Sequence, residues 1–339
     1  MGFEWSGHGD KVRWSIYFTV SDVPICLELA KFGMRIWHPK EDQPNKKRII
    51  GQLQSALRRL EEHLMPLIDA SINDGEVTVA NHSSEFRDRY EFFREKAGLS
   101  YAEAAAVEAK KEESIGARKK KSDEIGTITA LLGGFGEVMR NRREGFYYSV
   151  SMIDAYFSYL EHRTTLLRAF IGKPIDKGNF KTILGAKWDD KLRMIAPSPT
   201  SREFQTLLGR LRELKERIRN PFAHGGVEND GGSIFCHIPN VGAIPGNLSR
   251  IKNSARFRFI PVDTEDHTSV CELFDDVDSF LSKDQLAIPC ALAEGGVHPA
   301  WDNHNLSEYA KLNSSTMQEV TEFIMHWNRL QDMHENMDY

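Results

Sequence analysis

A long run of apolar residues with helical spacing constrains the fold of this chain most strongly. Between residues 144 and 171, apolar side chains recur at steps of three and four, with Thr164 in the single gap: Phe146, Val150, Ile153, Phe157, Leu160, Leu167 and Ile171. This spacing places them on one face of an amphipathic helix, and that face must be buried against other elements. Gly172 and Pro174 are expected to end the helix. The sequence therefore predicts a mainly α protein.

A second stripe on the same expected helix is polar. Its members also recur at steps of four and three: Asp154, Ser158, Glu161, Thr165 and Arg168. Such a stripe is typical of a solvent-facing surface. The alternative is that it lines a cleft shared with another helix.

Another helix is expected to begin at a capping box formed by Thr200 and Glu203. Leucines at 207, 208, 211 and 214, followed by Ile218, form its apolar side. Arg212, Lys215 and Arg219 form a short basic ridge on a different face. This ridge leads directly into the heptapeptide RNPFAHG, residues 219–225.

The heptapeptide combines two useful functional groups. Arg219 is a permanent cation that can hold a phosphate through two parallel hydrogen bonds, and His224 can move a proton near neutral pH. Asn220 is a favoured N-cap and Pro221 fits a first helical turn, so the helix is expected to break near Asn220. That break would let Arg219 and His224 point into the same space. The alternative is structural: the arginine pairs with a carboxylate and the histidine caps a helix end.

The order of long helix, second helix ending in R-N-x-x-x-H-G, β-containing excursion and closing helix resembles the HEPN superfamily. The resemblance covers about residues 126–339. It implies a HEPN-like helical bundle with a small β-containing insertion at about residues 230–312, between the motif helix and the last helix. Residues 1–125 precede it as a mostly helical region of unknown role.

The resemblance also implies an activity. Many HEPN proteins are metal-independent endoribonucleases without a cofactor, which dimerise through the motif face and act in toxin or antiphage-defence systems. By position, Arg219 and His224 match the catalytic residues and Asn220 matches a supporting one. Acidic residues on the first long helix often support such sites, which makes Glu161 and Asp154 candidates and leaves the choice between them open.

Contacts to the RNA backbone are expected from basic residues. The candidates are basic residues near the motif and near the start of the long helix: Arg212, Lys215, Arg142 and Arg143. Plain surface charge is the alternative for each of them. A competing function is a non-catalytic HEPN-like module that binds RNA or a protein partner, with Arg219 and His224 in structural roles.

The remaining segments give weaker signals. Residues 14–20 are expected to form a short strand, followed by a helix from Val23, and residues 45–70 another helix. Strands are expected at 233–238 and 255–260 with a loop between them, and a capping box at Thr316 begins the last helix. Residues 261–312 are poorly periodic.

A regulatory, antitoxin or sensor protein is the expected partner of the N-terminal region.

Composition excludes several classes of protein. The net charge of −5 and pI near 6.2 give no global attraction to nucleic acid, so any phosphate site must be local. The four cysteines are far apart, which favours reduced thiols. No apolar run has the ~20 residues that span a bilayer, and the first residues do not resemble a signal peptide. These features predict a cytoplasmic protein.

His298, Asp302 and His304 are expected to belong to a polar loop rather than to a metal site.

Overall fold

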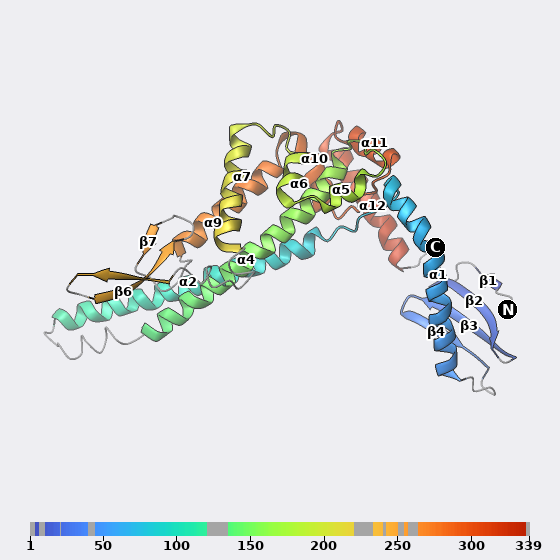
Figure 1. Ribbon diagram of the computed structural model, residues 1–339, viewed down its shortest axis with the longest axis horizontal. Helices are drawn as coiled ribbons and strands as arrows, with labels where there is room; N and C mark the ends of the chain where they lie inside the picture. Colours follow the sequence, from blue (N-terminus) through green and yellow to red (C-terminus); the bar gives the residue numbers. More distant parts are fainter. Residues whose placement is uncertain are drawn as a thin grey trace. The chain divides into compact units, whose positions relative to one another are not determined.

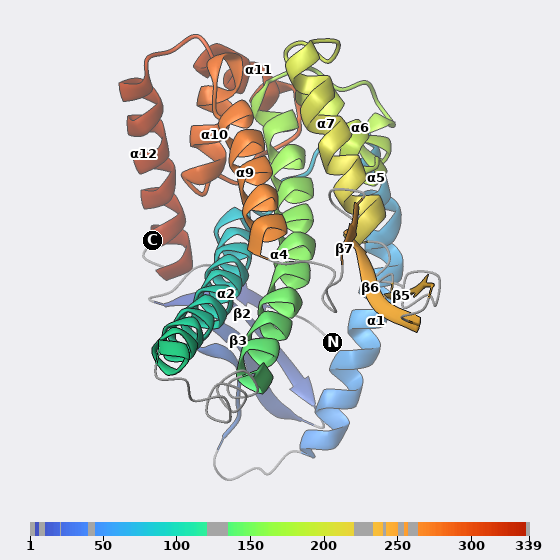
Figure 2. The same ribbon diagram turned by 90° about the vertical axis from the view of Figure 1, so that its left-hand side faces the viewer.

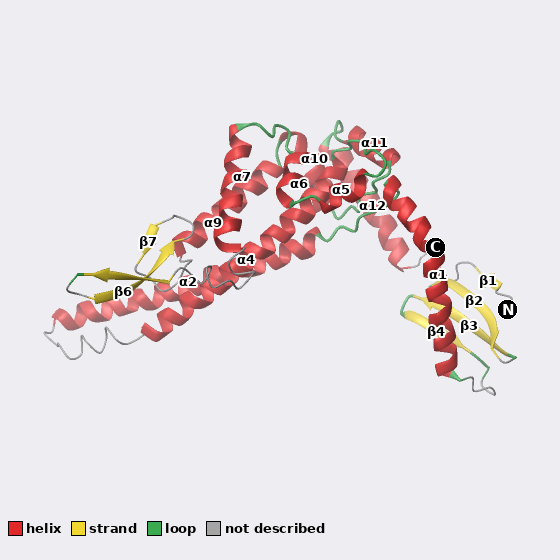
Figure 3. Cartoon of the chain, in the orientation of Figure 1, coloured by secondary structure: helices red, strands yellow, loops and turns green. Residues whose placement is uncertain are grey.

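The computed structural model describes residues 4–6, 11–20, 22–39, 45–120, 135–219, 233–239, 242–249, 254–256 and 264–336 (Figure 1). The chain divides into two compact units, which are described separately. Unit 1 comprises residues 1–80, 172–185 and 295–339, and unit 2 comprises residues 81–171 and 186–294. The described residues are mainly helical, as expected, and include a small three-stranded sheet in the region of the expected insertion (Figure 3).

The N-terminal part of unit 1 is a four-stranded antiparallel sheet in the order β1-β2-β3-β4. Its strands are β1 (Glu4–Ser6), β2 (Val12–Val20), β3 (Val23–Ala30) and β4 (Gly33–Trp37). Helix α1 (Lys46–Asp74) follows, and its first turns cover the sheet through Ile49 and Leu53, which pack against Val20 and Ile25. The strand expected at 14–20 is therefore confirmed.

The helix expected from Val23 is wrong, because that segment is strand β3. Apolar residues alternate there at Val23, Ile25, Leu27 and Leu29, which is the period of a strand and not of a helix. Pro24 is tolerated because β4 pairs only with residues 26–30 of β3, so the proline lies at the uncovered end of the strand.

The rest of unit 1 is helical. It consists of α5 (Asn179–Gly185), α11 (Asn303–Leu312) and α12 (Met317–Asn336). The expected capping box is confirmed: the backbone N–H of Thr316 donates to Glu319 at 2.7 Å, and that of Glu319 to the Thr316 hydroxyl at 3.3 Å. Gly172, which follows the long helix as expected, has φ +76°, and a Cβ there would lie 2.5 Å from the backbone nitrogen of Ala310.

Two long antiparallel helices, α2 (Ser83–Lys120) and α4 (Phe135–Phe170), form the centre of unit 2 (Figure 2). Pairs such as Tyr90 with Tyr156 and Tyr101 with Ser149 join them along their length. They approach closely at Gly145, where a Cβ would lie 2.8 Å from the Tyr101 ring. Because α2 and α4 share a core, the domain boundary expected near residue 125 lies inside unit 2.

The other elements of unit 2 surround this pair. They are α6 (Trp188–Ile195), α7 (Arg202–Leu214), the π-helical turn η1 (Lys215–Arg219), β5 (Ser233–Ile238), β6 (Gly242–Ser249), β7 (Ser254–Arg256), α9 (Thr264–Leu281), the 3-10 turn η3 (Asp284–Leu286) and α10 (Ala287–Glu294). Helix α7 begins one residue later than expected, because the hydroxyl of Ser201 accepts the N–H of Phe204. The segment expected to be a loop between two strands contains strand β6, and much of the unassigned segment 261–312 is helical.

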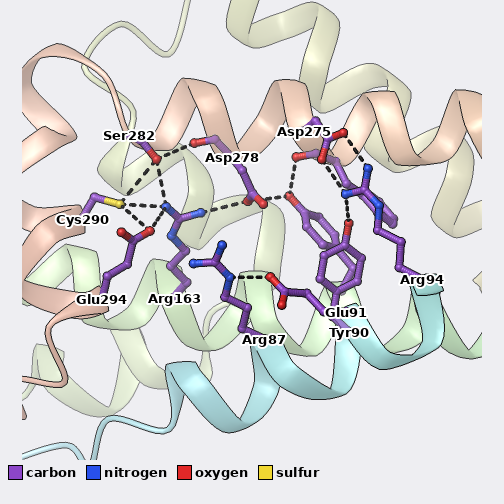
Figure 4. A network of polar contacts seen from close by, with 12 residues as sticks. Arg87, Tyr90, Glu91, Arg94, Arg163, Asp275, Asp278, Ser282, Cys290 and Glu294 are labelled. Carbon is purple, nitrogen blue, oxygen red and sulfur yellow. Dashed lines mark hydrogen bonds and ion pairs between the residues drawn. The ribbon is translucent and has the colours of Figure 1, made fainter.

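A network of buried polar groups joins α2, α4, α9 and α10 (Figure 4). At its centre the almost fully buried Arg163 donates to Asp278 at 2.9 Å, to the Ser282 hydroxyl at 3.2 Å and to the Cys290 sulfur at 2.8 Å. The phenol of Tyr156 also donates to Asp278, at 3.0 Å. Burial raises the pKa of Asp278, although the charge of Arg163 opposes this effect. The arginine therefore neutralises a carboxylate that the core would otherwise disfavour.

Replacing Arg163 by alanine should lower the free energy of unfolding by about 3–5 kcal/mol, because it leaves Asp278 without its buried cation. Urea denaturation measures this change. Arg87→Ala is the matched control, because Arg87 makes an ion pair with Glu91 along α2 and both side chains are about half exposed; it should cost less than about 1 kcal/mol. Equal losses in the two variants would contradict the network's role.

Two histidines in unit 2, the buried His267 and the half-buried His162, favour the neutral form. The ring Nε2 of His162 accepts the backbone N–H of His82 at 2.9 Å, and Nδ1 of His267 lies 3.1 Å from the buried Ser149 hydroxyl. Burial lowers the pKa of each histidine from its usual 6.5 to about 4. The unfolded chain therefore takes up protons before the folded chain does as the pH falls.

The histidines should make stability depend on pH. Their contribution is complete above pH 6.5 and is lost as the pH falls toward 4, because only the unfolded state binds the protons in that interval. Thermal melting at pH 8, 7, 6 and 5 should show an unchanged Tm above 7 and a decline below 6.5. The decline between pH 6.5 and 5 should be smaller in the double variant His162→Gln/His267→Gln, and an identical decline would contradict this origin.

Candidate functional site

The basic ridge reaches the motif through a change in helix type. The α-helical part of α7 ends at Leu214, and residues 215–219 continue as a π-helical turn. Leu214 and Ile218 are buried and hold this turn in the core of unit 2. Short π-helical segments are often found at functional sites. Asn220 and His224, with the expected helix break, lie outside the described residues.

Arg219 is the last residue of the π-helical turn, and it contacts the long helix α4. Its Nε donates to a carboxylate oxygen of Asp154 at 2.9 Å, and its guanidinium lies 5.5 Å from the centre of the Phe157 ring. Arg89 of α2 approaches the other carboxylate oxygen of Asp154 at 3.8 Å. The Arg219 side chain is 27% exposed and that of Asp154 is 51% exposed. The carboxylate and the ring thus orient a guanidinium that remains partly accessible to solvent.

Lys215 lies at the start of the same turn and rests on a second aromatic ring. Its ammonium is 5.3 Å from the centre of the Trp188 ring, and Trp188 contacts Phe157 edge to face at 5.2 Å. Burial and then the positive charge of Arg219 lower the pKa of Lys215. Two cations from one turn therefore lie over a pair of neighbouring aromatic rings, which help to hold the charged groups in place.

The two acidic candidates of α4 have different partners. Asp154 pairs with Arg219, whereas Glu161 accepts the ammonium of the buried Lys191 of α6 at 3.2 Å. Among the described contacts, Arg219 is therefore joined to Asp154 and not to Glu161. Other members of the polar stripe bond to their own helix: Ser158 donates to the carbonyl of Asp154, and Thr165 to that of Glu161.

The candidates for RNA backbone contacts differ in availability. Arg212 pairs with Asp189 of α6, and Arg142 donates to Glu108 of α2 at 2.8 Å. Arg143 is exposed. Arg142 and Arg143 lie roughly 17 Å along the helix axis from Asp154, because an α-helix rises 1.5 Å per residue. The structure therefore brings Lys215 next to Arg219, while Arg142 and Arg143 lie farther along α4.

Sequence reasoning missed two residues of this cluster, Arg89 and Trp188. Arg89 lies in a segment assigned to a separate region, and Trp188 begins a helix of 8 residues that the sequence did not lead us to predict, although its buried Trp188, Leu192 and Ile195 recur at helical spacing. Both come close to Arg219 only through the packing of α2 and α6 on α4. No local spacing in the sequence reports such packing.

Of the three residues expected in a polar loop, His298 lies in a loop, Asp302 is the N-cap of α11, and His304 lies in the first turn of that helix. His298 packs on Trp327, and Asp302 caps helix α11 by accepting the N–H of Asn305 at 2.9 Å. The described residues contain no group of three or more His, Cys, Asp or Glu side chains placed to hold a metal ion. They also include no helix with the length and apolar character needed to span a membrane.

Comparisons of the chain with protein-family models, with curated proteins and with solved structures found no match. Any assignment of function therefore rests on the motif and on the geometry around Arg219.

The ion pair between Asp154 and Arg219 should contribute little to stability. Both side chains reach solvent, so Asp154→Asn should change the free energy of unfolding by less than about 1 kcal/mol in urea denaturation. Asp278→Asn, in the buried network, serves as the comparison and should cost more, because it removes the shorter of the two ion pairs of the buried Arg163, at 2.9 Å against 3.4 Å for Glu294. A loss for Asp154→Asn as large as that for Asp278→Asn would indicate that Arg219 and Asp154 are structural.

Proposed function

We propose that the protein is a metal-independent endoribonuclease of the HEPN type. The observation that carries the proposal is the placement of Arg219: the first residue of the R-N-x-x-x-H motif is held by Asp154 and Phe157 of the long helix. A guanidinium oriented by a carboxylate keeps N–H groups available for a phosphate. Nearby Arg89 and Lys215 add positive charge. This local site attracts phosphate although the chain as a whole carries −5.

In the proposed reaction the RNA supplies its own nucleophile. The 2′-OH attacks the adjacent phosphorus, the new O2′–P bond forms, and the P–O5′ bond breaks. His224 takes the 2′-OH proton or gives a proton to the leaving 5′-oxygen. Arg219 stabilises the negative charge on the phosphoryl oxygens in the transition state. The products are a 2′,3′-cyclic phosphate and a 5′-OH, and DNA is not cleaved because it lacks the 2′-OH.

Asp154 has a positioning role in this proposal. Its carboxylate accepts from Nε of Arg219, and no contact among the described residues uses the terminal nitrogens of the guanidinium, which can therefore bind the substrate. Asn220 supports the same site. Two copies of the motif face meet across a two-fold axis, so each RNA phosphate contacts two arginines and two histidines. The protein would act in the cytoplasm as a toxin or antiphage-defence effector, restrained by a partner that binds the N-terminal region.

A second candidate is a non-catalytic module that binds RNA or a protein. The observation in its favour is the same ion pair, because an arginine paired with a carboxylate can be a purely structural element. In that case Arg219 would still affect RNA binding, but no cleavage would follow.

The decisive measurement is the incubation of purified protein with a labelled structured RNA in EDTA, followed by analysis of the fragment ends. Wild type should cleave and leave 2′,3′-cyclic phosphates. Arg219→Ala and His224→Ala should each lower the rate by at least about 100-fold, because each removes a group that acts in the transition state. Arg210→Ala is the matched control, because Arg210 lies on the same helix and pairs with Asp276; it should retain the wild-type rate.

Two results would contradict the nuclease. Unchanged cleavage by His224→Ala would remove the histidine from the mechanism. Tight RNA binding without cleavage by wild type, measured by fluorescence anisotropy, would favour the non-catalytic module. Asp154→Asn should slow cleavage with little loss of stability, which distinguishes a positioning role from a structural one.

A further inference from the structure

Helix α1 exposes more large apolar side chains than a helix that faces only solvent normally carries. From residue 54 to residue 71 every position of α1 is exposed. The exposed apolar side chains in and around this stretch include Ile50, Leu57, Leu60, Leu64, Met65, Leu67 and Ile68, with exposed fractions from 37% to 62%. Among the described residues, the first turns of α1 pack on the sheet of unit 1 through Ile49 and Leu53, and its last turns lie beside α5. A long amphipathic helix gains most of its stability from packing, so this stretch needs a partner.

The spacing of these residues indicates that the partner is another helix. The residues Ile50, Leu53, Leu57, Leu60, Leu64 and Leu67 follow one another at steps of three, four, three, four and three. Alternating steps of three and four residues are the a/d pattern of a coiled coil, in which one apolar seam meets the seam of a second helix. The seam is about 26 Å long, since an α-helix rises 1.5 Å per residue. Pro66 lies off this seam.

The charges of α1 indicate the identity and direction of the partner. Residues 46–59 carry five basic side chains and no acidic one, whereas residues 60–74 carry four acidic side chains and no Lys or Arg. This polarity is opposite to the one that stabilises a single helix, whose N-terminus favours acidic residues. Asp69 and Asp74 are offset within unit 1 by Lys181 and Lys177, but Glu61 and Glu62 make no described ion pair. An antiparallel second copy of α1 would place its acidic half beside the basic half.

The apolar seam, like the charges, fits an antiparallel pair related by a two-fold axis. In an antiparallel pair of identical helices centred between Arg58 and Arg59, Ile50 faces Leu67 of the second copy. Leu53 then faces Leu64, and Leu57 faces Leu60. Five of the six seam residues are exposed and find an apolar partner, while Leu53 is partly buried against the sheet and offers its remaining surface to Leu64. The contact is isologous. A parallel pair would set five basic residues beside five basic residues.

From these observations we propose that α1 is a self-association surface, which joins two copies of this chain through an antiparallel helix pair. The surface lies in unit 1 and is separate from the motif, so it does not depend on the proposed nuclease activity. It would bring two copies together even where the motif face makes no contact of its own.

Sedimentation velocity of the full-length protein over a range of concentrations tests this association. Leu57→Glu/Leu60→Glu places charge in the middle of the seam, and should halve the mass of the wild-type assembly and weaken association at least tenfold. Both leucines are exposed, so the fold should be unchanged by circular dichroism. Met65→Glu is the matched control, because Met65 is equally exposed on α1 but lies off the seam; it should keep the wild-type mass.

The outcomes separate the alternatives. Two results would overturn the proposal: a wild type that stays monomeric at every concentration, and a double variant that associates like wild type. Either result would indicate that a helix of another protein covers the seam. Arg219→Ala should leave the association unchanged, so failure of the nuclease and failure of the helix pair are distinguishable. If the motif face also associates, wild type is a tetramer and the double variant a dimer, and the mass still halves.

Disulfide cross-linking tests the direction of the pair. Chains with Ile50→Cys, mixed with chains with Leu67→Cys and oxidised, should form a disulfide-linked dimer of one chain of each kind. Wild type treated in the same way accounts for the native cysteines. Efficient cross-linking of two Ile50→Cys chains to each other would indicate a parallel pair and would overturn the proposed arrangement.

Discussion

The burial of α4 on several sides is the constraint on which unit 2 depends. Helix α2 covers one side of it, and α6, α9, α10 and the π-helical turn cover others. Where neighbouring elements cover α4, its polar side chains meet partners from those elements, whereas Arg143 and Glu144 remain exposed. Arg163 finds Asp278, and Asp154 finds Arg219. The same enclosure therefore produces both the buried network and the candidate site.

The sequence predicted the elements whose signals are local. The helix ended by Gly172, the capping box at Thr316 and the strand at residues 14–20 all follow from spacing or from caps. The segment from Val23 forms a strand and not the expected helix, because its apolar residues alternate and its backbone pairs with β2 and β4. Strand β6, which contains Gly and Pro, has the composition of a loop and forms by pairing with its neighbours.

The candidate site was predictable in part. Arg219 was identified from the motif, and Asp154 was one of two acidic candidates on the expected helix. The choice between Asp154 and Glu161 depends on which side of α4 the π-helical turn contacts, and the spacing of residues along α4 carries no information about that. Arg89 and Trp188 could not be predicted from the sequence either. They join the cluster because helix packing brings together residues that are distant in the sequence.

The π-helical turn also determines how a deletion or insertion in the chain would change this site. Such a turn accommodates one more residue than the α-helix would, so it behaves as a one-residue insertion in an otherwise regular helix. Returning it to α-helical geometry would rotate every following side chain by roughly 100° about the axis. Arg219 would then leave Asp154 and Phe157, although no residue of the cluster had been replaced. The chemistry of this surface is therefore sensitive to the length of the chain before the motif as well as to its residues.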